Sequence, residues 1–367
     1  MSFARGNRRE FSEISSVMKT ISKTIYIVLL TFLWQPIQAE IPEKRLFERA
    51  KKNEEGRFLN LAGELSKGDA AVRIPFMLRR VGTYFRDGQG APSLAETDTE
   101  KPVSAIKDFA TATWVGHATV LVQMEEVTIL TDPIWSNWPS PIKFIGPRRF
   151  VSPGILIENL PPIDVVLISH NHYDHLDLPS LKKLSSRNVN TQFVVPLGNA
   201  QLLIQHGIAN VLELDWGDTV TVNGASVICL PSQHWSKRSL TDTNKALWAS
   251  WAVIGKNKRF YFAGDTGFFP EFSDIGEKLG PFDLAAIPIG AYKPRSMMQS
   301  AHLNPEEAIR AALKLQAKKV LAIHFGTFDL SDEPLAEPQK RFMAAAAEQS
   351  LGQDNAWVTK IGQRKKF

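Results

Sequence analysis

Four side chains that could hold a metal ion lie within six residues of one another: His170, His172, Asp174 and His175. Neutral imidazole and carboxylate groups are ligands that zinc takes readily. Without a metal, burying so many polar groups would be costly in desolvation free energy. The cluster therefore predicts a metal centre of the kind that supports hydrolysis.

Three further apolar runs end at a possible ligand. Residues 227–234 end at His234, residues 259–265 at Asp265 between two glycines, and residues 320–324 at His324. Each is weak evidence alone, because a Gly-Asp-Thr turn and a histidine after a strand are common structural features. Their ordered occurrence after the cluster predicts one site where all seven side chains meet, since α/β proteins place their chemistry at the carboxyl ends of strands.

Strand and helix patterns alternate after Thr111, which indicates an α/β domain. Short apolar runs predict strands at residues 120–124, 127–132 and 164–169. Apolar residues at helical spacing predict helices at 178–184, 200–206 and 305–315, the last beginning behind Asn304. The histidine cluster therefore stands on the turn that leaves a buried strand.

With these residues the chain resembles the metallo-β-lactamase superfamily and, within it, the N-acylphosphatidylethanolamine-hydrolysing phospholipase D family, as a bacterial-type member. The narrower similarity rests on residues 114–120, 130–134, 160–164, 213–216, 231–238, 280–292 and 322–328. The first hundred residues match poorly. The resemblance implies a four-layer αββα metallo-β-lactamase sandwich at residues 111–367, preceded by a mostly helical extension at residues 40–110.

The resemblance also implies two zinc ions per chain and assigns their ligands. The implied ligands are His170, His172 and His234 for one ion, Asp174, His175 and His324 for the other, and Asp265 as the bridge. A hydroxide between the ions would attack the phosphodiester, because metal binding lowers the pKa of water to about 7. Asp174 would orient it and relay its proton. The implied products are an N-acylethanolamine and phosphatidic acid.

The sequence also suggests interpretations for four other side chains. Tyr173 and His302 match family positions that contact the substrate, and His302 is also expected in catalysis; the alternatives are a packed aromatic ring and a residue flanking a helix. His117 could hydrogen-bond to a ligand, although a structural role is the favoured interpretation. His206, in a helical stretch, is expected on the surface.

Composition excludes some functional classes. The chain has 367 residues, 44% of them hydrophobic and 22% charged, as in ordinary globular proteins. Of its formal charge of +5, the first 39 residues carry five Lys or Arg against two Glu, which leaves about +2 elsewhere. Nucleic acid binding is therefore not expected. The single cysteine, Cys229, is predicted to be a buried structural thiol.

The N-terminal region carries the expectations about location and partners. From Met18 a basic start, an apolar stretch at residues 24–34 and Ala39 form the pattern of a signal peptide at residues 1–39. That apolar stretch is short for a bilayer core of about 30 Å, so an uncleaved membrane anchor is the alternative. An exported, periplasmic or membrane-associated protein is expected. Residues 74–81, apolar with flanking arginines, could face a membrane surface, but packing on the main domain is favoured.

Three functions are compatible with the sequence. The first is a phospholipase D-like enzyme that meets its phospholipid at a membrane surface, as the homodimer that the resemblance implies. The second is a hydrolase of the same fold that acts on a small lactone or cyclic phosphodiester. The third is a non-catalytic lipid-binding module, against which the seven intact candidate ligands argue. The N-terminal region would distinguish the first function from the second, because a lipase needs an apolar path to its metal centre.

Overall fold

The structure, a computed structural model, describes residues 45–66, 68–83, 109–142 and 144–367. Contacts divide the chain into two units, Met1–Gln38 and Ala39–Phe367. The first unit lies outside the described residues, and so does the predicted signal peptide.

Two seven-stranded sheets form the centre of the second unit. The first sheet has the order β14-β1-β2-β3-β4-β5-β6. Its strands are β1 (Thr111–Gly116), β2 (Thr119–Gln123), β3 (Thr128–Thr131), β4 (Val165–Leu167), β5 (Gln192–Pro196), β6 (Val211–Leu214) and β14 (Arg364–Lys366). The second sheet has the order β13-β12-β11-β10-β9-β8-β7. Its strands are β7 (Thr219–Val222), β8 (Ala225–Leu230), β9 (Ser250–Ile254), β10 (Arg259–Phe262), β11 (Leu284–Pro288), β12 (Val320–Ile323) and β13 (Ala356–Trp357).

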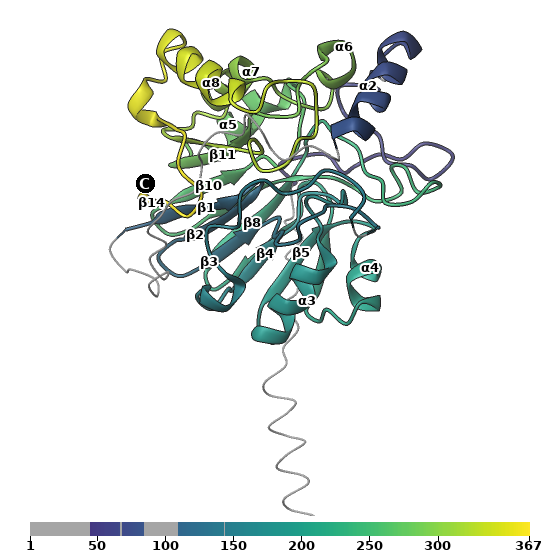
Figure 1. Cartoon of the computed structure of the whole chain (residues 1–367). Coiled ribbons are helices and arrows are strands. Elements are labelled where there is room, and N and C mark those ends of the chain that lie inside the picture. Colours follow the sequence, from purple (N-terminus) through teal and green to yellow (C-terminus); the bar gives the residue numbers. More distant parts are fainter. Residues whose placement is uncertain (1–44, 67, 84–108, 143) are drawn as a thin grey trace, which may run out of the picture. The chain divides into compact units, whose positions relative to one another are not determined.

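Helices cover the outer faces of both sheets (Figure 1). Helices α3 (Leu178–Arg187) and α4 (Ala200–Gln205) lie outside the first sheet, and α5 (Glu271–Leu279), α7 (Pro305–Lys314) and α8 (Glu337–Glu348) lie outside the second. Helix α7 begins as predicted, because Asn304 and Glu307 bind each other's backbone N–H groups in a capping box. This arrangement confirms the predicted four-layer αββα sandwich.

The apolar residues of each strand divide between two cores. In β4, Val165 and Leu167 face the larger core, to which both sheets contribute. Val166 and the following Ile168 face the smaller core, which Leu181 of α3 also enters. Side chains alternate between the two faces of a strand, so a strand covered on both sides reads as a continuous apolar run. Cys229 is fully buried in β8, as predicted.

Strand direction brings the candidate ligands to one edge of the sandwich. Strands β3 to β6 run parallel to one another, and so do β10 to β13. Strand β8 is antiparallel to β9, which is antiparallel to β10, so β8 and β10 point the same way. The loops that follow β4, β8, β10 and β12 therefore meet where strands of both sheets end.

The region before the sandwich contains one helix within its described residues, α2 (Ala70–Thr83). Only part of α2 packs as favoured from the sequence, because Phe76 is buried while Met77 and Leu78 are more than half exposed. Arg80 forms an ion pair with Asp329 in the loop after β12, with Nη1 2.6 Å from Oδ1. Residues 45–66 form turns and a short bridge between Lys52 and Phe58.

Candidate metal centre

The loop after β4 places the six-residue cluster at the edge of the sandwich. His170 and His175 are buried, whereas His172, Tyr173 and Asp174 are partly exposed. His234, Asp265 and His324 are buried as well. The seven candidate ligands predicted from the sequence therefore meet at one place. The partly exposed His172, Tyr173 and Asp174 mark its open side.

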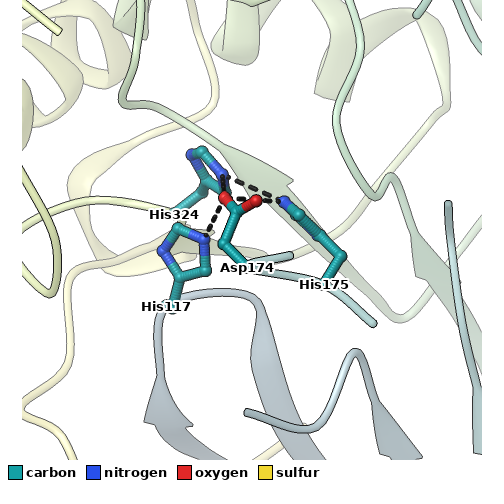
Figure 2. A group of neighbouring side chains, drawn as sticks. All are labelled: His117, Asp174, His175 and His324. Carbon is teal, nitrogen blue, oxygen red and sulfur yellow. Dashed lines mark hydrogen bonds and ion pairs between the residues drawn. The ribbon is translucent and has the colours of Figure 1, made fainter. Parts of the chain in front are cut away.

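One set of donors, which we call the aspartate group, consists of Asp174, His175 and His324 (Figure 2). The Nε2 atoms of His175 and His324 are 3.2 Å apart and lie 3.3 and 3.5 Å from Asp174 Oδ2. Asp265 faces the same point, with Oδ2 3.2 Å from His175 Nε2 and Oδ1 3.2 Å from His324 Nε2. Four side chains from three loops thus surround one position.

The second set, the three-histidine group, consists of His170, His172 and His234. His172 Nδ1 lies 2.7 Å from His170 Nε2 and 3.4 Å from His234 Nε2. Asp265 Oδ2 is 3.9 Å from His234 Nε2, so the same carboxylate lies beside both groups. Asp265 is therefore placed to contact a cation in either group.

These spacings suit metal coordination. Two ligand atoms about 2.1 Å from a tetrahedral zinc lie about 3.4 Å from each other, and the separations around Asp174, His175, His324 and Asp265 range from 3.2 to 3.5 Å. Asp265 Oδ1, which faces this position, is also buried without a hydrogen-bond partner. The imidazole and carboxylate donors are those that zinc and related ions prefer. The two groups are capable of holding metal.

Outer hydrogen bonds fix the candidate ligands. Asp132 accepts a bond from His175 Nδ1 at 2.6 Å, and its two oxygens also bind the N–H and the hydroxyl of Ser169. The same hydroxyl lies 2.9 Å from His170 Nδ1, and His234 Nδ1 donates to the carbonyl of Ala301 at 2.9 Å. These contacts turn each Nε2 atom toward the centre. Asp132 was not predicted from the sequence, although its position directly after β3 follows the same pattern as the candidate ligands.

His117 belongs beside the aspartate group. Its Nε2 lies 2.9 Å from Asp174 Oδ2 (Figure 2), and its ring centroid lies 4.1 Å from that of His324. A purely structural role was the favoured interpretation of His117, but the structure shows the alternative, a hydrogen bond to the candidate ligand Asp174. His117, Asp132 and His324 all have positive φ, at 54°, 31° and 62°. Backbone strain of this kind gathers at functional sites.

Burial keeps the imidazoles of the three-histidine group neutral. It lowers the pKa of His172 to about 4 and holds the pKa of His170 and of His234 well below its usual value. Burial likewise lowers the pKa of His302 to about 4 and that of His117 to about 3. Neutral imidazoles are the form that binds metal.

The aspartate group is more highly charged. Burial opposes the charge of Asp265, but His324 and His175 outweigh burial and hold the pKa of Asp265 well below its usual value. The neighbouring carboxylates in turn outweigh burial at both histidines, raising the pKa of His324 to about 9 and that of His175 well above its usual value. The positive charge that balances the carboxylates here is carried by His175 and His324, and a bound metal ion would displace the protons of these imidazoles.

Gly264 allows the Asp265 loop to approach the histidine cluster. Its φ is +58°, and a Cβ atom at this position would lie 2.4 Å from the Cβ of Ser169. Any side chain would push the two loops apart, since real Cβ atoms do not approach so closely. The glycine before Asp265 therefore sets the distance between this carboxylate and His170.

Tyr173 and His302 border the open side of the centre. Tyr173 donates its hydroxyl hydrogen to the carbonyl of Arg238 at 2.9 Å, and the Arg238 guanidinium lies 4.0 Å from the centroid of the ring. His302 Nδ1 lies 3.8 Å from Asp265 Oδ2, and its side chain is 13% exposed. Trp235, which the sequence analysis did not identify, packs against His172 with ring centroids 4.3 Å apart.

A pocket of about 970 Å³ adjoins this opening. None of the seven candidate ligands lines it; Asn171 and Tyr173 connect it to the cluster loop. Trp138, Phe144, Leu178 and Leu202 supply apolar walls, and Arg238 and Lys245 are among the polar residues. The pocket lies beside the centre and could hold part of a substrate larger than the reacting group.

Comparison with known proteins identifies relatives. The model of the β-lactamase superfamily domain matches residues 127–325, more than half of the chain. The chain is 44% identical over 259 residues to N-acyl-phosphatidylethanolamine-hydrolyzing phospholipase D 1 of Caenorhabditis elegans, covering 68% of this chain and 73% of the worm protein. It is 36% identical to the mitochondrial N-acyl-phosphatidylethanolamine-hydrolyzing phospholipase D of Saccharomyces cerevisiae, covering 70% of this chain and 55% of the yeast protein.

The predicted exported, periplasmic or membrane-associated location needs correction. The yeast relative is named as mitochondrial, which contradicts a bacterial export location. Across the described ranges, no helix has the length and hydropathy to cross a bilayer. The physical basis of the prediction was narrow, because it rested on a short apolar run in residues 1–39, outside the described residues. We assign no location.

Solved structures share the fold. The isothiocyanate hydrolase from Delia radicum gut bacteria is 18% identical with a TM-score of 0.56, covering 70% of this chain and 99% of that chain. Igni18, a metallo hydrolase from Ignicoccus hospitalis, is 21% identical with a TM-score of 0.54, covering 70% of this chain and 98% of that chain. The match to the superfamily domain and the 44% identity to the worm protein show that the chain belongs to the metallo-β-lactamase superfamily and, within it, to the family of N-acyl-phosphatidylethanolamine-hydrolysing phospholipase D proteins.

Proposed function

We propose that the protein is a zinc-dependent phosphodiesterase that hydrolyses N-acylphosphatidylethanolamine to an N-acylethanolamine and phosphatidic acid. The observation that carries this proposal is the pair of donor groups on either side of Asp265. The names of the worm and yeast relatives support the choice of substrate.

In this proposal the seven residues would hold two zinc ions. His170, His172 and His234 would hold one ion, Asp174, His175 and His324 the other, and Asp265 would contact both. Bound zinc would supply activation of water at neutral pH and polarisation of a phosphoryl oxygen. The protein contributes the fixed orientation of these side chains through Asp132, Ser169 and the Ala301 carbonyl.

Asp174 would move a proton during hydrolysis. Its Oδ2 is within 3.5 Å of three ring nitrogens, those of His117, His175 and His324, and its side chain is 16% exposed (Figure 2). A carboxylate held by buried groups on one side and open on the other can accept the proton of an attacking water molecule. His117 would hold Asp174 in position, and His302 and Tyr173 would contact the substrate at the opening.

The adjoining pocket favours a substrate with a long apolar part. Its aromatic and aliphatic walls begin at Tyr173, beside the proposed position of the phosphodiester, and its volume of about 970 Å³ exceeds what a small lactone needs. The exposed Met77 and Leu78 of α2 could contact the lipid around the substrate.

The direct test offers the purified protein a mixed lipid extract and identifies products by mass spectrometry. Release of N-acylethanolamines together with phosphatidic acid supports the proposal, and Asp265→Asn should release neither. An unchanged extract, with turnover of a lactone or cyclic phosphodiester, would assign the second function. No turnover of any substrate by zinc-loaded protein would favour a non-catalytic lipid-binding module.

The homodimer implied by the resemblance is part of the proposal. Light scattering coupled to size-exclusion chromatography should give twice the chain mass of 41.0 kDa. A monomer mass across the accessible concentration range would remove this element and leave the proposed chemistry intact.

A further inference from the structure

A single side chain from the N-terminal region pairs with the backbone of His234. Asn60 Nδ2 donates to the carbonyl oxygen of His234 at 2.8 Å, and Asn60 Oδ1 accepts from its N–H at 3.0 Å. The same oxygen accepts from Trp248 Nε1 at 3.1 Å. The Asn60 amide therefore satisfies both backbone groups of one candidate metal ligand that lies 174 residues away in the sequence.

The backbone at His234 has no strand partner of its own. Strand β8 ends at Leu230, the next residue is Pro231, and residues 231–235 belong to no helix or strand. His234 is fully buried, so its backbone groups need partners within the protein. The two bonds hold the peptide units on both sides of the His234 Cα, and they therefore set the direction of the imidazole.

The segment that carries Asn60 is itself firmly held. Phe58 is 2% exposed in the larger core, and its N–H donates to the carbonyl of Asn244 at 2.8 Å. Asn244 also accepts from the N–H of Ser236, two residues after His234, at 3.2 Å. Farther along, Gln233 Nε2 donates to the carbonyl of Gly63 at 3.3 Å. Residues 58–63 and 233–236 thus form one bonded unit.

We infer that Asn60 is a positioning residue for the metal centre: it holds the backbone of His234 so that the imidazole reaches the three-histidine group. The ring is fixed independently by the Ala301 carbonyl, and Asn60 supplies the second constraint. The inference rests on the proposed metal centre, and it makes the N-terminal region a structural part of that centre. The aspartate group has no contact with Asn60, so the effect should be confined to one ion.

The test compares four full-length proteins: wild type, Asn60→Ala, Asn60→Asp and Asn53→Ala. Asn60→Asp keeps the size of the side chain and the acceptor for the His234 N–H but loses the donor to its carbonyl. Asn53 is the matched control, because it lies in the same segment and its Oδ1 binds only local N–H groups, those of Glu55 and Arg57. Zinc per chain is measured by mass spectrometry of the metal, and the two zinc dissociation constants by competition with a chromogenic chelator.

Asn60→Ala should weaken the binding of zinc in the three-histidine group by about 10- to 100-fold, because residues that hydrogen-bond to metal ligands typically contribute that much to affinity. The affinity for zinc in the aspartate group should stay unchanged. Asn60→Asp should weaken zinc binding in the same group, and Asn53→Ala should leave the zinc affinity of both groups unchanged. Replacement of zinc by cobalt should show an altered visible spectrum for that ion alone in both Asn60 variants.

The inference would be overturned if both Asn60 variants kept the wild-type zinc dissociation constants. It would also be overturned if zinc binding weakened equally in both groups, because general destabilisation of the protein would affect both sites. If Asn60→Ala does not fold, Asn60→Asp carries the same test. Wild-type protein that binds no zinc would instead refute the metal centre on which the inference rests.

Discussion

The two donor groups of the centre are built from the same kind of strand-end loops but differ in charge. The aspartate group combines Asp174 with two histidines, and the outer partner of His175 is the buried carboxylate of Asp132. The three-histidine group has no carboxylate of its own, and its outer partners are neutral, the Ser169 hydroxyl and the Ala301 carbonyl. Because Coulomb attraction is strong in a buried site, we expect a cation to bind more tightly in the aspartate group.

The largest effect should come from Asp265→Asn, which alters a carboxylate that faces both groups. We expect phosphodiesterase activity to fall by more than about 100-fold, because even outer partners of metal ligands contribute 10- to 100-fold. Metal analysis should show loss of zinc from both groups, while circular dichroism shows the fold retained. A variant that keeps full zinc content and activity would show that Asp265 is not shared.

Asp132→Asn should affect the aspartate group selectively. The substitution removes the charge that His175 Nδ1 contacts at 2.6 Å while preserving size. We expect zinc affinity in that group to fall by about 10- to 100-fold, with the other ion retained, as measured by chelator competition. The pattern is opposite to that expected for Asn60→Ala, so the two variants together test whether the groups are separate sites.

Ser169→Ala should have the smallest effect of the three and should reach both groups. Its hydroxyl lies between Asp132 Oδ2 at 2.5 Å and His170 Nδ1 at 2.9 Å. We expect a loss of activity of about tenfold, at the low end for outer partners, measured as kcat on a micellar phospholipid. Gly264 leaves no space for a larger residue, so alanine is the informative substitution. Weakening of only one zinc ion would show that the hydroxyl supports a single group.

Much of this centre could be predicted because its candidate ligands follow a local rule. An apolar run followed by His or Asp marks the end of a buried strand, and parallel strands end at the same edge. The four-layer sandwich followed from the resemblance, while alternating strand and helix patterns were only compatible with it. His234 departs slightly from the rule, since it lies four residues beyond the end of β8.

Contacts between distant segments could not be predicted in the same way. The bonds from Asn60 to His234 and from Tyr173 to Arg238 join loops of unrelated sequence pattern. His117 has a positive φ of 54°, a backbone conformation that the residue type does not predict. The exposed apolar face of α2 was also misjudged, because helical spacing shows that residues share a face but not what covers it.

The most direct test of the two-group centre is the zinc content of full-length protein purified without chelator. The proposal predicts about two zinc ions per chain, released in two steps by a competing chelator, the first from the three-histidine group. Fewer than one metal ion per chain, after exposure to excess zinc and removal of the unbound ion, would contradict it.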